Sequence, residues 1–499
     1  MAASIDEKRR RVQEAFDAAY RLADEGEAGP LAMFEPALWT AVLGIGRALM
    51  ALWIVRCAAR PRPARYAHDG RAYEIVGTET GEVGTRFGKI EYEGPVGRLV
   101  GWKRAARDLP LDRELGLCGG FSLLAVTTLV RLCAQMAFAS ARKTFRDMFE
   151  WSPSQRATLR MVDGLGAEAR PFLDQAPPPE GDGEVLVIQV DGKGAPAISS
   201  REHARRRQPH RRPKSGTTRR RERRERRRKN PRPRRAPGKK SKNAKMAAVG
   251  VLYTLRKTEK GLEGPLNKRV YGTFESYRAL FEWLLSEAKK RGYGTGKFAK
   301  VLFVADGSDT LWELQKELFP DAEVCLDWYH VVEKLWKTGK ALHRNSRRRL
   351  EAWVAVQKRR LRRGQVKEVI DELRAILDTT PRTGPGNKHR RRVLDQTIGH
   401  FTKNAHRMRY HALRRQDLDI GSGVVEGAVR NLVGVRLDGP GMRWGRDRME
   451  AVLLLRCILI NGQWDDFSRY LAAKNGVVLR SQPIPTRTHD AKPNLKKAA

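Results

Sequence analysis

The sequence predicts an α/β fold built on a mixed five-stranded sheet, and two observations support this prediction. First, residues 185–190 (VLVIQV) and 301–305 (VLFVA) are almost entirely apolar, which is typical of strands buried on both faces. Second, three more strand-like runs, at 247–255, 268–273 and 323–326, are separated by turns or by segments with helical spacing of apolar residues. The resulting order is three strands, a helix, a strand, a helix, a strand and a final helix.

The N-terminal region is expected to be mainly helical. Residues 5–25 and 32–58 have helical patterns and define a module over residues 1–65, and short extended pieces between Gly and Pro residues predict a small β element over 66–110. The apolar run 37–55 approaches membrane-spanning length, but Arg47 lies at its middle. Because a charge at the centre of a bilayer is costly, we expect a buried helix and no membrane partner.

Residues 111–175 are expected to form a helical, DNA-binding region. A break near Trp151 separates two predicted helices, and Ser152 and Pro153 have the composition of a helix start. Two short helices around a tight turn resemble a helix-turn-helix, in which Arg156 and Arg160 would face phosphates or base edges. An ordinary helical hairpin explains the same pattern equally well.

The first strand of the sheet ends at Asp191 and Gly192, and the strand at 301–305 ends in the same way at Asp306 and Gly307. Asp-Gly is also a common hairpin turn, so Asp191 alone could be a turn residue. However, right-handed crossovers place the fourth strand beside the first and parallel to it, with a ligand-binding crevice at their carboxyl ends. We therefore expect Asp191 and Asp306 to lie close together.

Two adjacent carboxylates repel each other unless a cation lies between them, and oxygen ligands suit Mg²⁺ or Mn²⁺. A third acidic ligand is expected in GSGVVEGAVRNLVGVR, residues 421–436, where Ser422 can start a helix that carries Glu426. The apolar side chains of this helix would face the core: Val425, Val429, Leu432 and Val433. A solvated Glu426 paired with Arg430 one turn later is the structural alternative.

The charge of the chain predicts a polyanionic partner. The 499 residues include 98 Lys or Arg and 57 Asp or Glu, a formal net charge of +41. Residues 201–245 alone hold 23 Lys or Arg and three acidic residues, so we expect a disordered insertion that contacts nucleic acid. A solvated segment with only a localisation role is the alternative. The expected contacts are Arg219, Arg220, Arg221, Arg223, Arg224, Arg226, Arg227 and Arg228.

An ordered set of motifs resembles a known family. The set comprises VDG (190–192), VADG (304–307), FPDAEVCLDWYHVVEKLW (319–336), SGVVEGAVRNLVGVR (422–436) and GMRW (441–444). It is similar to bacterial insertion-sequence transposases of the ISKra family, which are relatives of the Mutator-like DDE transposases. The resemblance covers about residues 185–467, with weaker similarity in LPLDRELGLCGGFS (109–122).

The resemblance implies a ribonuclease H-like catalytic core over residues 185–342 and 420–467, with an all-α insertion over 343–419 and a flexible tail over 468–499. Asp191, Asp306 and Glu426 would form the catalytic triad and hold two Mg²⁺ or Mn²⁺ ions, with Asp191 bridging them. Asp309, which could also replace Asp306, would join Asp327, His330 and Arg430 as supporting residues around this site.

The implied activity is cleavage of insertion-sequence ends and joining of the freed 3′ hydroxyl to target DNA. Bringing two DNA ends together implies a homodimer or a larger assembly, in the bacterial cytoplasm at the nucleoid. Two other functions remain open on the sequence. One is a ribonuclease H-like nuclease or resolvase that stops after hydrolysis, and the other is a non-catalytic DNA-binding protein.

Overall fold

The computed structural model describes residues 5–26, 29–101, 107–199, 202, 204, 244–439 and 442–474. The chain divides into two compact units. The first comprises Met1–Thr128, Arg146–Ser152 and Asp465–Ala499, and the second comprises Leu129–Phe145 and Pro153–Trp464. The predicted arginine contacts between positions 219 and 228 lie outside the described residues.

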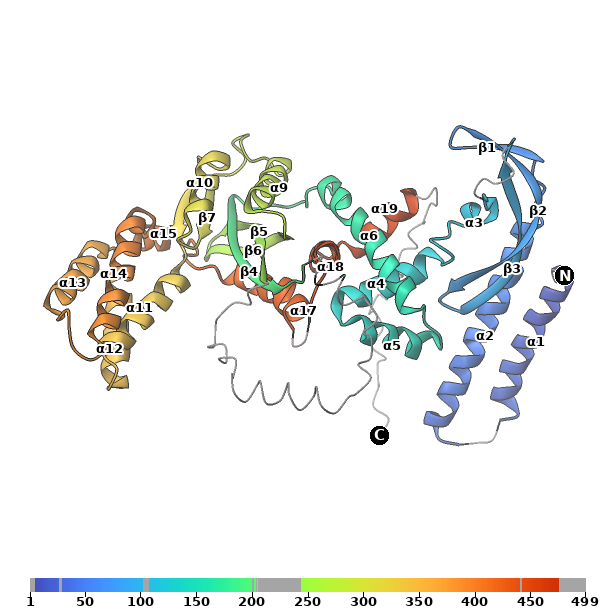
Figure 1. Cartoon of the computed structure of the whole chain (residues 1–499), viewed down its shortest axis with the longest axis horizontal. Coiled ribbons are helices and arrows are strands. Elements are labelled where there is room, and N and C mark those ends of the chain that lie inside the picture. Colours follow the sequence, from blue (N-terminus) through green and yellow to red (C-terminus); the bar gives the residue numbers. More distant parts are fainter. Residues whose placement is uncertain are drawn as a thin grey trace, which may run out of the picture. The chain divides into compact units, whose positions relative to one another are not determined.

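The first unit combines two helices with a small antiparallel sheet (Figure 1). The helices are α1 (Ile5–Asp24) and α2 (Leu31–Ala58), and the strands β1 (Arg65–His68), β2 (Arg71–Thr85) and β3 (Gly88–Leu99) pair in that order. Alternate residues of β3 are buried, as expected for a strand with one face on a core. The core contains Ile54, Cys57, Val83, Ile90, Tyr92 and Leu111, the last from α3 (Pro110–Glu114).

Helix α2 corrects one expectation. Only Leu43, Ile54 and Cys57 of its 28 residues are buried, so the prediction of a buried helix is wrong. By length and composition α2 is long and apolar enough to cross a membrane. It also has contacts within its own unit, because the Arg47 Nε donates a hydrogen bond of 2.9 Å to the carbonyl oxygen of Phe87.

The second unit contains the predicted mixed sheet, which has the ribonuclease H-like arrangement. Its strands are β4 (Val185–Pro196), β5 (Ala244–Thr258), β6 (Gly261–Thr273), β7 (Lys300–Ala305) and β8 (Glu323–Leu326). Their order is β6-β5-β4-β7-β8, with β4 antiparallel to β5 and parallel to β7. Since β4 lies at the centre, its apolar residues are buried on both faces, as the sequence predicts.

Helices cover both faces of this sheet (Figure 1). On one face α9 (Tyr277–Lys290) packs so closely that a Cβ on Gly250 would lie 2.8 Å from Leu284. On the other face a Cβ on Gly272 would lie 2.7 Å from Leu432. The crossover helices α10 (Asp309–Leu318) and α11 (Trp328–Leu342) begin and end where the sequence predicts.

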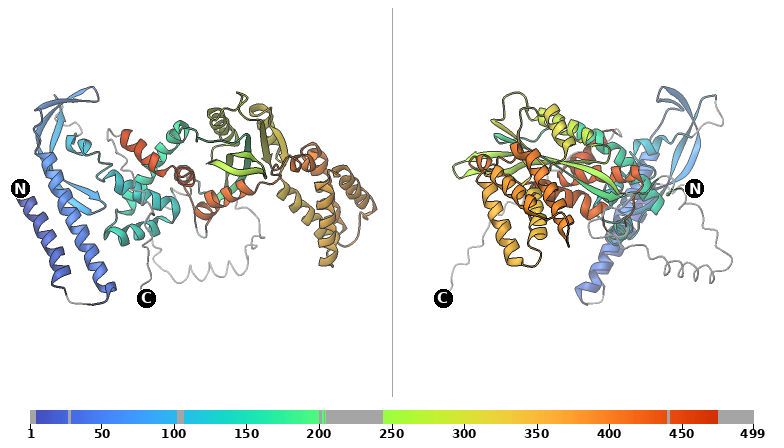
Figure 2. Two further views of the ribbon diagram at one scale, coloured as in Figure 1. Left: turned by 180° about the vertical axis from the view of Figure 1, so that it is seen from behind. Right: turned by 60° about the vertical axis from the view of Figure 1, so that its left-hand side comes forward.

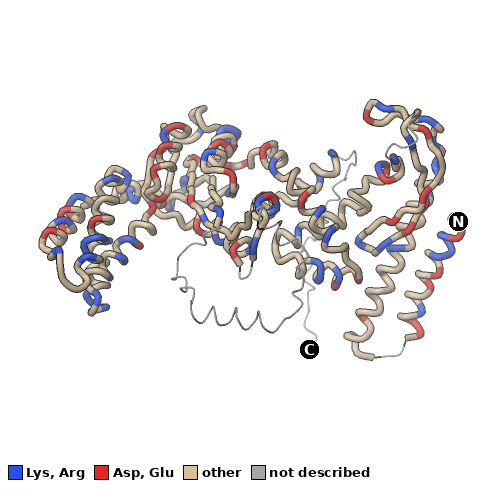
Figure 3. Tube along the Cα trace, viewed as in Figure 1, with Lys and Arg blue, Asp and Glu red and all other residues tan. Residues whose placement is uncertain are grey.

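The predicted insertion is all-α. It contains α12 (Arg347–Arg362), α13 (Val366–Thr379), α14 (Asn387–Asn404), a 3-10 turn η1 (Ala405–Arg407) and α15 (Tyr410–Arg414). Figure 2 shows these helices (orange) gathered into a bundle beside the sheet. Lys and Arg are frequent along α12 and α14 (Figure 3). Thr338 of α11 and Thr397 of α14 share a buried hydrogen bond of 2.9 Å, which joins the bundle to the core.

Several helix and strand ends differ from the predictions. Helix α6 (Gln155–Gln175), which follows α4 (Leu123–Gln135) and α5 (Phe138–Phe149), is capped by Ser154 rather than Ser152, because the Ser154 Oγ accepts from the N–H of Ala157. Ser276 caps α9, because its Oγ accepts from the N–H of Ala279. Strand β4 continues to Pro196, so Asp191 lies opposite Val249 within the ladder and is not a turn residue.

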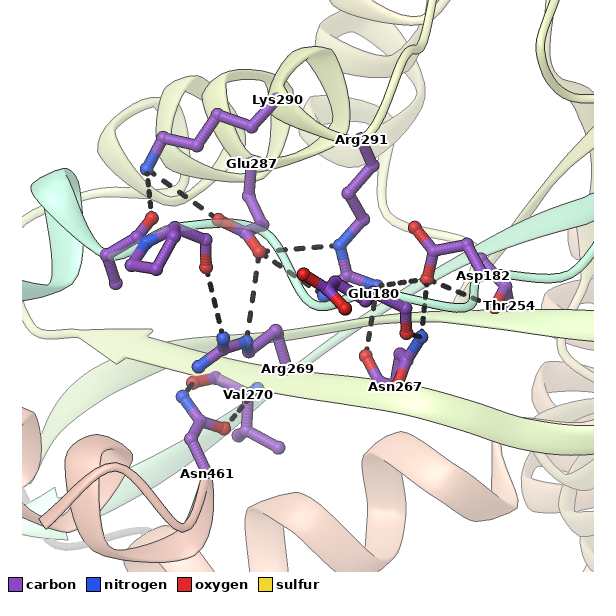
Figure 4. A network of polar contacts seen from close by, with 12 residues as sticks. Glu180, Asp182, Thr254, Asn267, Arg269, Val270, Glu287, Lys290, Arg291 and Asn461 are labelled. Carbon is purple, nitrogen blue, oxygen red and sulfur yellow. Dashed lines mark hydrogen bonds and ion pairs between the residues drawn. The ribbon is translucent and has the colours of Figure 1, made fainter. Parts of the chain in front are cut away.

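The Pro- and Gly-containing segment 176–183 has polar contacts within the second unit (Figure 4). Asp182 lies 3.6 Å from the guanidinium of Arg291, and the Asn267 side-chain amide donates to Asp182 and to the carbonyl of Glu180. Arg291 also pairs with Glu287 at 3.2 Å. These charges are buried, so they stabilise the fold only while they remain paired.

The C-terminal end of the described chain is helical. Helix α18 (Arg446–Ile460) is followed by α19 (Trp464–Lys474), so the first residues of the predicted flexible tail belong to a helix. The remainder of that tail, residues 475–499, lies outside the described residues.

Candidate active site

Two of the predicted carboxylates lie where the parallel pairing of β4 with β7 ends, Asp306 directly after β7 and Asp191 within the longer strand β4. Val190 of β4 is paired with Ala305 of β7, and Asp191 and Asp306 are the next residues of the two segments. The Asp191 Oδ1 accepts the Gly192 N–H at 2.6 Å, and the Asp306 Oδ1 accepts the Ser308 N–H at 2.9 Å. In the part of the chain that the structure describes, the second oxygen of each carboxylate has no protein donor.

Glu426 extends toward this pair from α16 (Gly423–Val429), as the sequence predicts. The apolar residues expected to face the core, Val425, Val429, Leu432 and Val433, are all buried, while Glu426 is exposed. The Ser422 Oγ donates a hydrogen bond of 2.9 Å to the Glu426 Oε1. Among the described residues no ion pair joins Glu426 to Arg430, so the pairing in the structural alternative is not seen, although Glu426 is exposed as that alternative expects.

Asp191 is affected by the charges of the other two carboxylates. Burial raises the pKa of Asp191, and the negative charges of Asp306 and Glu426 raise it further. The Gly192 N–H and the charge of His330 oppose this rise. A carboxylate that is half-buried beside two others is unfavourable unless positive charge compensates it.

Two buried polar side chains fix the start of α16. Gln189 of β4 is fully buried, and its Oε1 accepts the Val425 N–H at 3.0 Å while its Nε2 donates to the carbonyl of Gly421 at 3.2 Å. The Oδ1 of buried Asp327 accepts the Ser422 N–H at 2.8 Å. Because the first N–H groups of a helix have no partners within it, these two acceptors position Glu426 relative to β4.

Asp327 also orients His330. As the N-cap of α11, Asp327 accepts the N–H groups of Tyr329 and His330, and its Oδ2 lies 2.5 Å from the His330 Nδ1. Burial would raise the pKa of Asp327, but its bonds with His330 and Ser422 lower it overall. The hydrogen bond to Asp327 and the charges of Asp327, Asp191 and Asp306 raise the pKa of His330 to about 9. His330 is therefore positively charged at neutral pH.

The segment after α16 is a π-helical turn, η2 (Arg430–Gly434), followed by α17 (Val435–Leu437). A π turn leaves carbonyl oxygens without their usual α-helical partners. The buried guanidinium of Arg456 satisfies two of them, since it donates to the carbonyl oxygens of Asn431 and Leu432. The predicted supporting residue Arg430 is exposed in this turn.

Three further residues near the site were not identified from the sequence. A Cβ on Gly192 would lie 2.2 Å from the hydroxyl of Tyr277, the first residue of α9, and burial with the charges of Asp306 and Asp191 raises the pKa of Tyr277 to about 12. His400 of α14 covers Gly307. Gln189 had one available signal, because it is the single polar residue in VLVIQV.

Asp309, the alternative to Asp306, is exposed and pairs with Lys403 at 2.5 Å. This ion pair turns Asp309 toward α14. The structure therefore brings Asp191, Asp306, Glu426, Asp327 and His330 to one edge of the sheet, and it gives Asp309 a different partner.

The donor set fits divalent cations with oxygen ligands. Asp191, Asp306 and Glu426 each present carboxylate oxygens, the ligands that Mg²⁺ and Mn²⁺ prefer. The ligand atoms of Asp327, His330 and Glu426 also lie within 4.8 Å of one another. However, the oxygens of Asp327 already accept hydrogen bonds from Ser422, Tyr329 and His330. Asp327 is therefore better placed to orient His330 and the Glu426 helix than to bind an ion.

Replacing Asp327 with Asn is expected to lower activity about 10- to 100-fold, the usual effect of losing a residue that orients a metal-site side chain. The Asn side chain has no negative charge and can present its NH₂ group to the His330 Nδ1, where the Asp327 carboxylate now lies. We expect the pKa of His330 to fall toward its ordinary value of 6.5, measured by NMR of labelled histidine. Asp321→Asn, at an exposed turn position two residues before β8, is the control, and an unchanged pKa of His330 in Asp327→Asn would contradict this role.

The predicted DNA-contacting residues Arg156 and Arg160 lie in a different place. Both are exposed on α6 and line a cleft of about 610 Å³. Arg448 of α18 shares this cleft and forms a two-point ion pair with Asp163 at 2.8 and 2.5 Å. The cleft is thus lined by three arginines and one carboxylate.

Comparisons with known proteins find similarity only among solved structures. No protein-family model matches the sequence, and a search of curated proteins finds no match. Among solved structures the chain is similar to the Drosophila P element transposase strand transfer complex, with 11% sequence identity over 71% of this chain and 82% of that chain. The TM-score is 0.24, which is too low to carry an argument about fold or function.

Proposed function

We propose that this protein is a DNA transposase of the DDE type, similar to the ISKra family of bacterial insertion sequences. The observation that carries the proposal is the convergence of Asp191, Asp306 and Glu426 at one edge of a ribonuclease H-like sheet. The net charge of +41 supports a polyanionic substrate, for which DNA is the proposed form. The proposed reaction is cleavage at the ends of the element, followed by joining of the freed 3′ hydroxyl to target DNA.

In this proposal Asp191, Asp306 and Glu426 hold two Mg²⁺ or Mn²⁺ ions, with Asp191 between them. When bound, such ions stabilise the attacking and leaving oxygens of an in-line displacement at phosphorus. Gln189 and Asp327 keep α16 against β4, so that Glu426 remains beside the other two carboxylates. His330, held by Asp327, presents a positive charge to the negative substrate.

Other parts of the chain are proposed to bind the DNA. Arg156, Arg160 and Arg448 line a cleft suited to a phosphate backbone, and the basic segment 201–245 would add contacts without sequence preference. Joining two ends requires at least two active sites, so we propose a homodimer or larger assembly at the bacterial nucleoid.

The deciding experiment measures the transfer of a labelled linear DNA into a plasmid. The end of the linear DNA carries the genomic sequence that flanks the coding region of this protein. Purified protein, this DNA and a supercoiled plasmid are incubated with Mg²⁺, and the label is followed on a gel. A transposase is expected to move the label into the plasmid, and Glu426→Gln is expected to prevent this while leaving DNA binding intact. The paired control is Glu450→Gln, a half-buried glutamate that bonds to Thr273 and Phe274 on another side of the sheet.

The same assay separates the alternatives. Nicks and cut ends without labelled plasmid would show a nuclease or resolvase, and would contradict strand transfer. DNA binding with no cleavage in wild type or variants would show a non-catalytic DNA-binding protein. The convergence of the three carboxylates favours an enzyme over that last function.

A further inference from the structure

A row of positive side chains lies along α11 and α14 next to Asp306. On α11, His330, Lys334 and Lys337 are spaced so that they share one face of the helix. On α14, His400 and Lys403 also share a face. The two helices pack together through the Thr338–Thr397 hydrogen bond, and His400 of α14 lies on Gly307, next to Asp306.

His400 brings α14 directly onto the turn that contains Asp306. A Cβ on Gly307 would lie 2.1 Å from the His400 Cε1, so the imidazole ring occupies the space where any other residue would place its side chain. The His400 Nε2 is buried without a hydrogen-bond partner among the described residues. Burial and the charges of Lys334, His330 and Lys403 lower the pKa of His400 to about 4, so this ring is neutral.

Among the described residues, Lys334 is the lysine of this row that has neither an ion pair nor a side-chain hydrogen bond. Lys403 pairs with Asp309, and Lys337 donates to the amide oxygen of Gln396 at 3.4 Å. In the described part of the chain, no carboxylate lies within ion-pair distance of the half-buried Lys334 ammonium. Burial and the charge of Lys337 lower the pKa of Lys334, and the charges of Glu333 and Asp306 oppose this effect. An ammonium that is partly removed from water without an anion is unfavourable, and a bound anion would offset this cost.

We propose that α11 and α14 form a phosphodiester subsite beside Asp306, with Lys334 as its principal cation. The ligand is a phosphate of the nucleic-acid strand that enters the carboxylate site. The three carboxylates alone would repel that strand, and Lys334 with charged His330 supplies the opposite sign on the adjacent wall. His400 packs on Gly307 and so holds α14 against the Asp306 turn. The proposal rests on the proposed function only in taking DNA as the ligand.

The test compares DNA affinities at two salt concentrations. Full-length wild-type protein and Lys334→Met bind a duplex that ends with the DNA flanking the coding region, in Ca²⁺ buffer. Each phosphate contact releases about one counterion, so loss of one contact reduces the slope of log Kd against log salt concentration by about one. The ratio of variant to wild-type Kd should therefore shrink about 3.5-fold between roughly 50 and 200 mM salt.

Two variants make this test specific for the charge of Lys334. Lys334→Arg retains a cation and should keep the ratio of dissociation constants independent of salt. Lys289→Met removes an exposed lysine near the far end of α9 from Tyr277 and should also leave the ratio independent of salt. Thermal unfolding of each variant verifies that it is folded.

A salt-independent ratio for Lys334→Met would overturn the subsite, and so would Lys334→Arg behaving like the methionine variant. These outcomes differ from failure of the proposed function. If the Lys334→Met ratio depends on salt but the wild type joins no DNA, the result supports the subsite and contradicts the transposase activity. If the wild type joins DNA but the Lys334→Met ratio does not depend on salt, the result supports the transposase activity and contradicts the subsite.

Discussion

Replacing Asp191 with Asn is expected to reduce DNA cleavage and joining by about 10³-fold or more. Positioning metal ions at the reacting phosphate contributes several kcal/mol to lowering the barrier, and each 1.4 kcal/mol is a factor of ten in rate. Asp191 lies on the central strand β4, and in the proposed mechanism its loss would affect both ions. Single-turnover cleavage of labelled DNA in Mg²⁺ measures the effect.

The same substitution is expected to stabilise the metal-free protein. Burial and the neighbouring carboxylates raise the pKa of Asp191, so its ionised form is less favourable in the folded chain than in the unfolded chain. That penalty is present at neutral pH and disappears as the pH falls through the raised pKa. Asn removes it at every pH, while its side-chain oxygen can still accept the Gly192 N–H.

Urea unfolding with and without Mg²⁺ provides a measurement that does not depend on activity. Mg²⁺ should raise the free energy of unfolding of the wild type and should have little effect on Asp191→Asn. Asp174→Asn is the matched control, because burial also raises the pKa of Asp174 but this residue lies at the end of α6. Equal Mg²⁺ effects on wild type and Asp191→Asn would contradict a metal site at this residue.

Replacing Arg291 with Met is expected to lower the free energy of unfolding by about 3 to 5 kcal/mol, the usual effect of removing one partner from a buried ion pair. The Arg291 side chain is 0% exposed and lies between Glu287 at 3.2 Å and Asp182 at 3.6 Å. Its Nη1 also donates to the carbonyl oxygen of Asn267 at 2.9 Å. Methionine would leave two buried carboxylates without their shared cation.

An exposed arginine of the same helix provides the comparison. Arg278 pairs with Glu317 on the surface, and Arg278→Met is expected to change the free energy of unfolding by about 0 to 1 kcal/mol. Chemical denaturation of both variants measures the difference. Similar losses for Arg278→Met and Arg291→Met would show that burial of the network in Figure 4 is not what makes it important.

The sequence predicts strands and crossover helices well where the signal is local. Apolar runs and helical spacing locate β7, β8, α10 and α11 to within a residue. Helix starts were less predictable, because Ser152 and Ser154 are both good caps and only backbone geometry selects Ser154. The extension of β4 to Pro196 depends on pairing with β5 across residues 201–243, which a local pattern cannot reveal.

For the candidate site, the sequence by itself determined which carboxylates end the central strands, because a strand-Asp-Gly pattern occurs twice and crossover handedness makes the two strands neighbours. Tertiary structure alone decided how Glu426 is held. Its helix is fixed by Asp327 and Gln189, whose bonds join residues 95 and 236 positions apart in the chain. The same is true of His400, which lies on Gly307, next to Asp306, because the helices of the insertion pack back onto α11. Such contacts depend on packing between segments that are distant in the sequence, and local composition and spacing do not predict that packing.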